Sequence, residues 1–474
     1  MISDLRLAFA SRSFLLILGL SALFRSISFI TLPDSPSIFG PDEGTYAALA
    51  KYVSTGLPVQ EFPVYGPDLY NTSKALTLPG AILVTIGMNE LHAVRIISSL
   101  YGLLSILAVA LCFITMQQIK QQKLLDTNLD FQRTQTFFLA LFSFLPSNFV
   151  WSVIGLRESA SQFWIIASSY FLLKVRVYFG KRTLVYAFLA FISITLAFVA
   201  RPETALIFTV LAAFFCLLYA FVSRHMTALI IVLLGVIAGT FFSSSPPVKT
   251  EIYFEVTQLG STKSDKPDGK SESNEQIYRA LSRYCTEENQ IIRFKQEKLL
   301  CKERVEFQKT KKVSGEMFQK KLLTPQQLTE KRNVNAVNSV SSLPPSKCNL
   351  FSDLIRVLTC SVSELPYRLF SLLFRPLVFI DQGTPFFFYA SLENLLWLII
   401  VPFAIFKSLQ RNQTSKSRFL NLFLVSYMIC FASAAALYEG NLGTAFRHKS
   451  SLLWSVILIL MINTRYAQKR HILN

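Results

Sequence analysis

Apolar residues in this chain gather into long blocks that are separated by short polar segments. Most blocks are about 17 to 22 residues long, the length that an α-helix needs to cross a hydrocarbon core of about 30 Å. The pattern predicts an all-α polytopic membrane protein with about ten transmembrane helices. The expected spans are residues 13–32, 95–117, 135–153, 159–175, 183–200, 204–222, 227–243, 386–406, 419–437 and 450–465.

Two shorter apolar segments lie between the first two spans. Residues 44–55 carry apolar side chains at the i, i+3, i+4, i+7 spacing of an amphipathic helix, which favours a helix lying on the membrane surface. Residues 75–87 are short for a span and contain Pro79, so they predict an interfacial or re-entrant helix.

Composition and charge support a membrane protein. Hydrophobic residues make up 52% of the 474 residues and charged residues only 16%, against roughly 25% charged in soluble proteins. The net charge of +18 comes largely from basic residues in short loops between the spans. These loops lie on the same predicted side of the membrane as Arg6 and Arg12. By the positive-inside rule this side, with both termini, is cytoplasmic. We therefore expect an integral protein of the bacterial plasma membrane, and no nucleic-acid partner.

The pattern divides the chain into three parts. Residues 1–243 form an N-terminal transmembrane module that includes the first outer loop, 33–94. Its first apolar block is expected to stay as a helix, because no small-residue cleavage site follows it. Residues 244–385 form a large extracytoplasmic segment that ends in an amphipathic return helix at 366–380, and residues 386–474 hold the last transmembrane helices.

Four of the seven cysteines fall in the large outer segment, and three fall in predicted spans. An even number in an oxidising compartment is typical of disulfides, and the pairs 285–301 and 348–360 are one of three possible pairings. The outer cysteines lack the spacing of a zinc site. No metal site or cofactor is predicted, although a divalent metal is left open.

An acidic pair, Asp42 and Glu43, follows the first span directly. One interpretation is that these carboxylates cap the helix at 44–55, since acidic residues stabilise helix N-termini. The other is catalytic: a carboxylate at the outer membrane surface accepts a proton from a hydroxyl that attacks an activated sugar carbon. The two roles are compatible, and both residues are candidates.

Two similar motifs, at 156–159 and 201–204, place an arginine near a glutamate at the outer end of a span. The candidates are Arg157 with Glu158 and Arg201 with Glu203. A simple interpretation is interfacial arginines with local counter-ions. The functional interpretation is that their guanidinium groups line an outward cavity and bind an anionic lipid phosphate.

Further candidates lie on the same predicted outer side. The turn at 438–449 contains two glycines and several basic residues, which suits a ligand as well as an ordinary interfacial turn. Lys74 and Arg95 also lie on this side, and a simple interpretation of each is an anchor at the membrane interface. The candidates in these segments are Lys74, Arg95, Arg447 and His448 for phosphate binding, and Tyr46, Glu439 and Asn441 for the cavity.

The first outer loop resembles that of the type C glycosyltransferases. The acidic pair, Tyr46 and the spacing of Tyr70, Lys74 and Pro79 carry the resemblance, and the run at 86–102 is similar to the entry into the second span. The branch with protein O-mannosyltransferases and lipid A aminoarabinose transferases is most similar. The resemblance implies that Asp42, or else Glu43, activates the acceptor while basic residues hold a polyprenyl phosphate.

These observations predict a membrane glycosyltransferase. It would move a sugar from a polyprenyl-phosphate donor to an extracytoplasmic glycan, lipid or protein. The alternative is an envelope polysaccharide polymerase, ligase or lipid-linked glycan transporter that works without a carboxylate base. A transporter needs polar groups along a path through the membrane. Few polar residues fall within the predicted spans, which disfavours transport.

Overall fold

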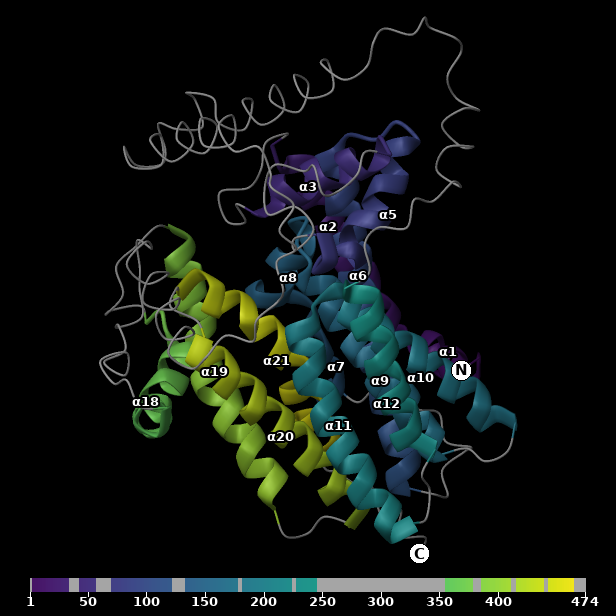
Figure 1. The fold of residues 1–474 in the computed structure, drawn as a ribbon, viewed down its shortest axis with the longest axis vertical. Coiled ribbons are helices and arrows are strands. Elements are labelled where there is room, and N and C mark those ends of the chain that lie inside the picture. Colours follow the sequence, from purple (N-terminus) through teal and green to yellow (C-terminus); the bar gives the residue numbers. More distant parts are fainter. Residues whose placement is uncertain are drawn as a thin grey trace, which may run out of the picture.

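The structure is a computed structural model that describes residues 2–33, 42–56, 70–121, 133–177, 181–223, 227–244, 354–377, 385–410, 415–438 and 442–463. Within these ranges the regular secondary structure is α-helical, and most helices form one elongated bundle (Figure 1). The outer cysteines 285, 301 and 348 lie outside the described residues. Cys360 is disulfide-bonded, and its pairing stays a prediction.

The helices follow the predicted blocks closely. They are α1 (Ile2–Ala10), α2 (Arg12–Thr31), α3 (Asp42–Ser54), α5 (Lys74–Thr85), α6 (Glu90–Gln121), α7 (Arg133–Phe144), α8 (Pro146–Val153), α9 (Glu158–Val177), α10 (Lys181–Ala200), α11 (Pro202–Ser223), α12 (Thr227–Ser244), α18 (Leu354–Phe374), α19 (Pro385–Leu409), α20 (Ser415–Tyr438) and α21 (Leu442–Asn463).

Six of the described helices are long and apolar enough to cross a membrane, namely α2, α6, α10, α19, α20 and α21. The pair α7–α8, bent by 46°, makes a seventh if it is one span. These apolar helices indicate an integral membrane protein, and the described part of the chain is all-α. A helix or helix pair occupies each of the ten predicted ranges, but α9 is too polar to qualify and the apolar parts of α11 and α12 are shorter. The number of ten crossings stays a prediction.

Local sequence explains several helix boundaries. The Ser11 hydroxyl accepts a hydrogen bond from the backbone N–H of Phe14 (3.3 Å) and so caps α2. Pro146 begins α8, a position where its missing N–H costs nothing, and separates α8 from α7. Helices α3 and α5 are present where the sequence predicts short helices. They pack on each other and on α6 at one end of the bundle (Figure 1).

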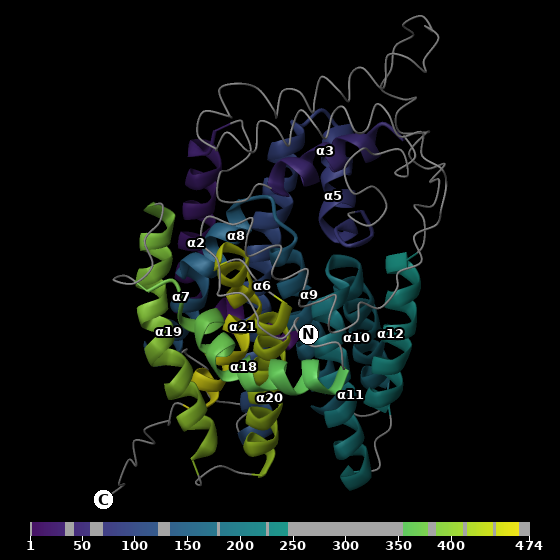
Figure 2. The same ribbon diagram turned by 60° about the vertical axis from the view of Figure 1, so that its left-hand side comes forward.

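Helix α18 differs from the expected return helix. It begins at Leu354, before the expected start at Pro366, and ends at Phe374, before the expected end at 380. Pro366 lies inside this helix. Figure 2 shows α18 running across the direction of α19 and α20, and its contacts are mainly with α20.

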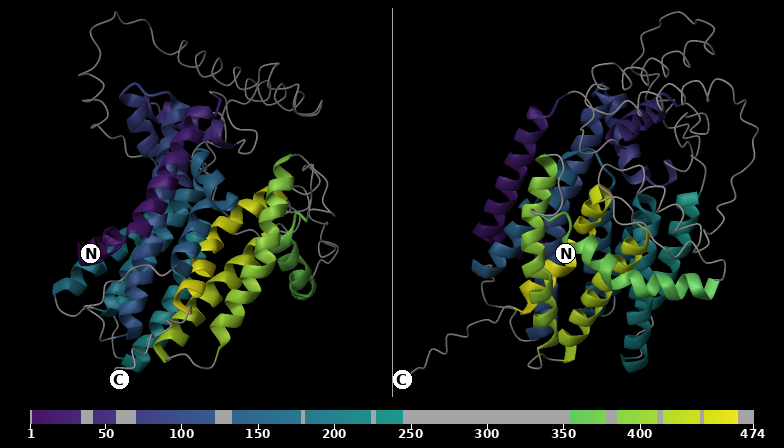
Figure 3. Two further views of the ribbon diagram at one scale, coloured as in Figure 1. Left: turned by 180° about the vertical axis from the view of Figure 1, so that it is seen from behind. Right: turned by 90° about the vertical axis from the view of Figure 1, so that its left-hand side faces the viewer.

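Helices at the edge and at the centre of the bundle differ in burial. Helix α2 lies on the outside (Figure 3), and its buried residues are Phe14, Ile17, Ser21 and Arg25. In contrast, every residue of α21 from Ser451 to Ile462 is buried. Helix α21 is thus a central element, and it packs against α6, α7, α8, α9, α18, α19 and α20.

The turn between α8 and α9 packs tightly against α6. The Ser98 hydroxyl lies within 3.2 Å of the carbonyl oxygens of Trp151, Ile154 and Leu156, which fixes the turn. A Cβ added at Gly155 would lie 2.5 Å from Cγ2 of Val94. Only glycine permits this approach, and it positions the start of α9.

This close packing predicts a stability defect in Gly155→Ala. The added methyl group forces Val94 or the turn to shift, and we expect the free energy of unfolding to fall by about 1–3 kcal/mol. Thermal unfolding of the purified protein in detergent measures the change. Gly19→Ala in α2 is the control, because a Cβ there meets no described atom within 4 Å. Equal melting temperatures for the two variants would contradict the prediction.

Candidate functional site

The starts of four helices meet at one end of the bundle. Asp42 begins α3, Glu158 begins α9, Arg201 immediately precedes α11, and Arg447 and His448 lie in the first turns of α21. Helix N-termini carry partial positive charge and unpaired N–H groups, so this end of the bundle favours anions.

A continuous network of charged side chains joins these helices. Arg447 donates one terminal N–H to Asp42 Oδ2 (2.8 Å) and the other to Glu158 Oε1 (2.8 Å). Arg201 NH1 lies 3.3 Å from the same Glu158 oxygen, and Arg201 NH2 lies 3.3 Å from His448 Nε2. Glu158 is the centre of the network, because two guanidinium groups share one of its oxygens.

Exposure changes sharply across the network. The Glu158 side chain is 1% exposed, that of Arg447 is 12% exposed, and that of Asp42 is 49% exposed. Burial alone raises the pKa of Glu158, but the charges of Arg447, Arg201 and Arg157 outweigh it and hold this pKa well below its usual range. The arginines therefore favour the ionised form of Glu158, and Asp42 is the half-exposed carboxylate of the network.

Tyr46 and Arg157 lie beside the network. Tyr46 is buried, which raises the pKa of its phenol to about 12, and it interacts electrostatically with Arg157 and Glu158. Arg157 NH1 donates to the carbonyl oxygen of Thr72 (3.0 Å), and Arg157 also interacts with Glu203. Arg157 thereby connects the start of α9 with the segment just before α5.

Glu43 has different surroundings from Asp42. Its two carboxylate oxygens accept hydrogen bonds from Arg95 Nε (2.8 Å) and NH2 (3.2 Å), and Oε1 also accepts from Gly155 N (2.9 Å). Both side chains of the pair are fully buried. Arg95 NH1 also donates to the carbonyl oxygen of Pro33 (2.8 Å). The pair joins α3, α6, the turn before α9 and the end of the first span.

Lys74 lies at the start of α5. Its ammonium group donates to the carbonyl oxygen of Phe242 at the end of α12 (2.7 Å) and lies 5.2 Å from the centre of the Tyr70 ring. Burial lowers the pKa of Lys74 to about 8. The other two sequence candidates, Glu439 and Asn441, lie outside the described residues.

Sequence reasoning missed a buried polar cluster beneath the site. Glu393 in α19 accepts hydrogen bonds from Ser147 N (2.6 Å) and Trp397 Nε1 (2.8 Å). Lys449 in α21 donates to Asn394 and to the carbonyl oxygen of Arg375. A single glutamate in an otherwise apolar span was the available signal. This cluster fixes α8 and α21, and so the position of Arg447.

Within the described part of the chain, no three side chains of His, Cys, Asp or Glu are grouped to hold a metal ion. The described network places the half-exposed carboxylate of Asp42 beside guanidinium groups. These groups can neutralise an anion.

No family model matches the chain, and no curated protein matches it in sequence. Among solved structures, it is similar to the crystal structure of ArnT from Cupriavidus metallidurans in the apo state. The identity is 12%, the match covers 95% of this chain and 77% of that chain, and the TM-score is 0.35. Similarity at this level assigns neither residues nor an activity to the chain.

The buried Glu43–Arg95 pair predicts a large stability effect. Arg95→Met leaves Glu43 buried without its counter-ion, and we expect the free energy of unfolding to fall by about 3–5 kcal/mol. Removing both charges in Arg95→Met/Glu43→Gln should restore part of this loss. Chemical or thermal unfolding in detergent measures each variant.

The control is Lys51→Met, because Lys51 pairs with Glu90 at the surface, where the Lys51 side chain is 50% exposed. Such a pair contributes about 0–1 kcal/mol. The interpretation of a buried structural pair fails if Arg95→Met is no less stable than Lys51→Met.

Proposed function

We propose that this protein is an integral membrane glycosyltransferase that uses a polyprenyl-phosphate sugar as donor and acts on an extracytoplasmic glycan, lipid or protein. One observation carries the proposal. Asp42 is a half-exposed carboxylate held by Arg447, and Arg447 lies among further arginines at four helix N-termini. This is an acid–base group placed directly beside an anion-binding site.

The distribution of basic residues supports an outward-facing site. Glu158 begins α9, whereas Arg176 lies in the last turn of the same helix, so the two are separated by about 27 Å along it. Lys181 and Arg182 begin the next helix at the end remote from Asp42. By the positive-inside rule the basic end is cytoplasmic and the Asp42 end is extracytoplasmic.

In the proposed reaction the acceptor hydroxyl attacks the anomeric carbon of the donor sugar. The bond between that carbon and the phosphate oxygen breaks as the new glycosidic bond forms. Asp42 takes the proton from the acceptor hydroxyl, and polyprenyl phosphate leaves with the bonding electron pair. Arg447 and Arg201 neutralise the charge that develops on the departing phosphate.

The other candidates have supporting roles in this proposal. Arg157 and Lys74 approach from the α5 side and add positive charge for the phosphate. His448 positions Arg201, and Tyr46 forms the buried floor beneath Asp42. Glu43 and Arg95 hold α3 in place, so that Asp42 is the base and Glu43 is a structural residue.

Asp42→Asn tests the proposed base. The amide cannot accept the proton, and loss of a general base costs at least about a hundredfold in rate. Mass spectrometry of envelope glycans compares cells with the native gene, without it, and with Asp42→Asn. We expect the variant to lack the same sugar that the deletion lacks.

Glu90→Gln is the matched control, because Glu90 is a carboxylate at the same end of the bundle, and the described structure pairs it with the exposed Lys51. It should restore the glycan. If Asp42→Asn restored the glycan as fully as Glu90→Gln, a polymerase or ligase that needs no carboxylate base would replace the proposal.

The lowered pKa of Lys74 predicts a pH dependence of donor binding. Lys74 is charged below a pH of about 8 and neutral above it, so the KM for the lipid-phosphate donor should rise as the pH increases from 7 to 9. The loss of one charged hydrogen bond corresponds to a rise of about tenfold.

The guanidinium of Lys74→Arg keeps its charge over this range. The KM of that variant should therefore stay level between pH 7 and 9. Steady-state kinetics on the purified protein measures both. A level KM in the native protein, or the same rise in Lys74→Arg, would show that Lys74 does not bind the phosphate.

A further inference from the structure

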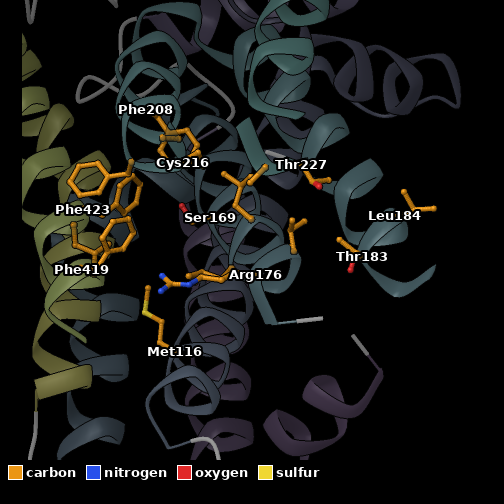
Figure 4. A pocket seen from close by; sticks show the side chains of 17 residues that line it. Met116, Ser169, Arg176, Thr183, Leu184, Phe208, Cys216, Thr227, Phe419 and Phe423 are labelled. Atoms are coloured by element: carbon orange, nitrogen blue, oxygen red, sulfur yellow. The ribbon is translucent and has the colours of Figure 1, made fainter. Parts of the chain in front are cut away.

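A cavity of about 360 Å³ lies at the end of the bundle remote from Asp42. Helices α9, α10, α11, α12 and α20, together with Met116 of α6, line it (Figure 4). Arg176 in the last turn of α9 contributes to its wall, whereas the candidate site lies at the first residue of that helix. The cavity is therefore separate from the network around Glu158.

The lining of this cavity is amphipathic. Most of it is apolar and includes Phe208, Phe215, Phe419 and Phe423. Its polar groups are the Arg176 guanidinium and the hydroxyls of Ser169, Thr183 and Thr227. Such a lining fits a ligand with a long apolar part and one anionic group.

The Arg176 guanidinium is held at the wall of the cavity. Its Cζ atom lies 5.2 Å from the centre of the Phe419 ring, which is itself part of the lining. A guanidinium over an aromatic ring is stabilised by a cation–π interaction, and arginine is a side chain that can bind a phosphate through two N–H groups. Arg176 is the charged residue of the lining, and it lies at the depth of the helix ends.

The cavity opens at the periphery of the bundle, beside α10. Leu184 lines it and is 67% exposed, and Lys181 and Arg182, two exposed basic residues, precede it at the start of α10. Basic residues at the cytoplasmic membrane surface attract the headgroups of anionic lipids, and basic pockets between transmembrane helices bind them. A lipid can thus enter from the surrounding leaflet past α10.

We propose that this cavity binds an anionic phospholipid from the leaflet remote from Asp42, which the basic loops predict to be cytoplasmic. The headgroup phosphate lies on Arg176 and the nearby threonines, and one acyl chain lies among the phenylalanine rings. The bound lipid fills the space between α9 and α20 and so connects these two helices at this end of the bundle.

Native mass spectrometry of the purified, delipidated full-length protein tests this proposal, with phosphatidylglycerol as the probe. Arg176→Gln should reduce the bound phosphatidylglycerol about fivefold, the effect of one lysine or arginine near a lipid surface. Arg6→Gln is the matched control, because Arg6 is an exposed basic residue on α1 at the same end of the bundle. It should bind as the native protein does.

A second variant, Ala228→Phe, keeps the charge and fills the cavity, since Ala228 is a half-buried part of the lining. It should also reduce bound phosphatidylglycerol about fivefold, which tests the cavity even if Arg176→Gln does not fold. The melting temperature of each variant in detergent shows whether it is folded.

Three competitors identify the ligand. Phosphatidylcholine and free glycerol phosphate should not displace phosphatidylglycerol at equal concentration, because the first lacks net charge and the second lacks acyl chains. Displacement by either would overturn the proposal, as would equal binding by Arg176→Gln and Arg6→Gln. Stronger displacement by a polyprenyl phosphate would also overturn it and would assign the cavity to a prenyl lipid.

Discussion

The arrangement at the Asp42 end of the bundle depends on one buried carboxylate, that of Glu158. A carboxylate at 1% exposure is unstable unless opposite charges compensate it. Here Arg447 and Arg201 share one oxygen of Glu158, and their own burial is tolerable for the same reason. Because these residues come from the starts of α9, α11 and α21, the ion pairs hold three helices together and also place two guanidinium groups side by side.

The position of Asp42 depends on a second buried pair. Glu43 and Arg95 fix the first turn of α3 against α6 and against the backbone of Gly155. Asp42 is the preceding residue, so its side chain is directed toward Arg447 instead. Stability and candidate chemistry are therefore divided between two adjacent carboxylates: one is fully enclosed, and the other remains half-exposed at the mouth of the network.

The sequence predicted the helices well because apolar blocks of membrane length leave little choice of structure. It also identified Asp42, Arg201 and Arg447 as charged residues at one end of the spans. Only the family resemblance ranked Asp42 before Glu43. The residues alone did not separate them, because the direction of a side chain in a first helical turn is decided by what that helix packs against. Cys360 shows the same limit, since its disulfide was expected but its partner follows from tertiary structure.

The polar clusters show why the remaining contacts were not predictable. Glu393 accepts a hydrogen bond from Ser147, which is 246 positions away in the sequence, and Lys449 reaches Arg375 across 74 positions. Spacing along one helix carries no information about such pairs. Helix α9 is a related case: serines and Gln162 make it too polar for a simple apolar span, because its faces are covered by other helices.

Under the proposed function, the contact between Asp42 and Arg447 implies an order of binding. The Arg447 N–H that Asp42 occupies is also one of the groups that would bind the donor phosphate. A phosphate that binds there competes with Asp42 for the guanidinium, while Glu158 keeps the other terminal nitrogen in place. Donor binding would then release the Asp42 carboxylate at the moment when an acceptor hydroxyl needs a base. The donor should bind before the acceptor, and water is not activated while the site is empty of donor.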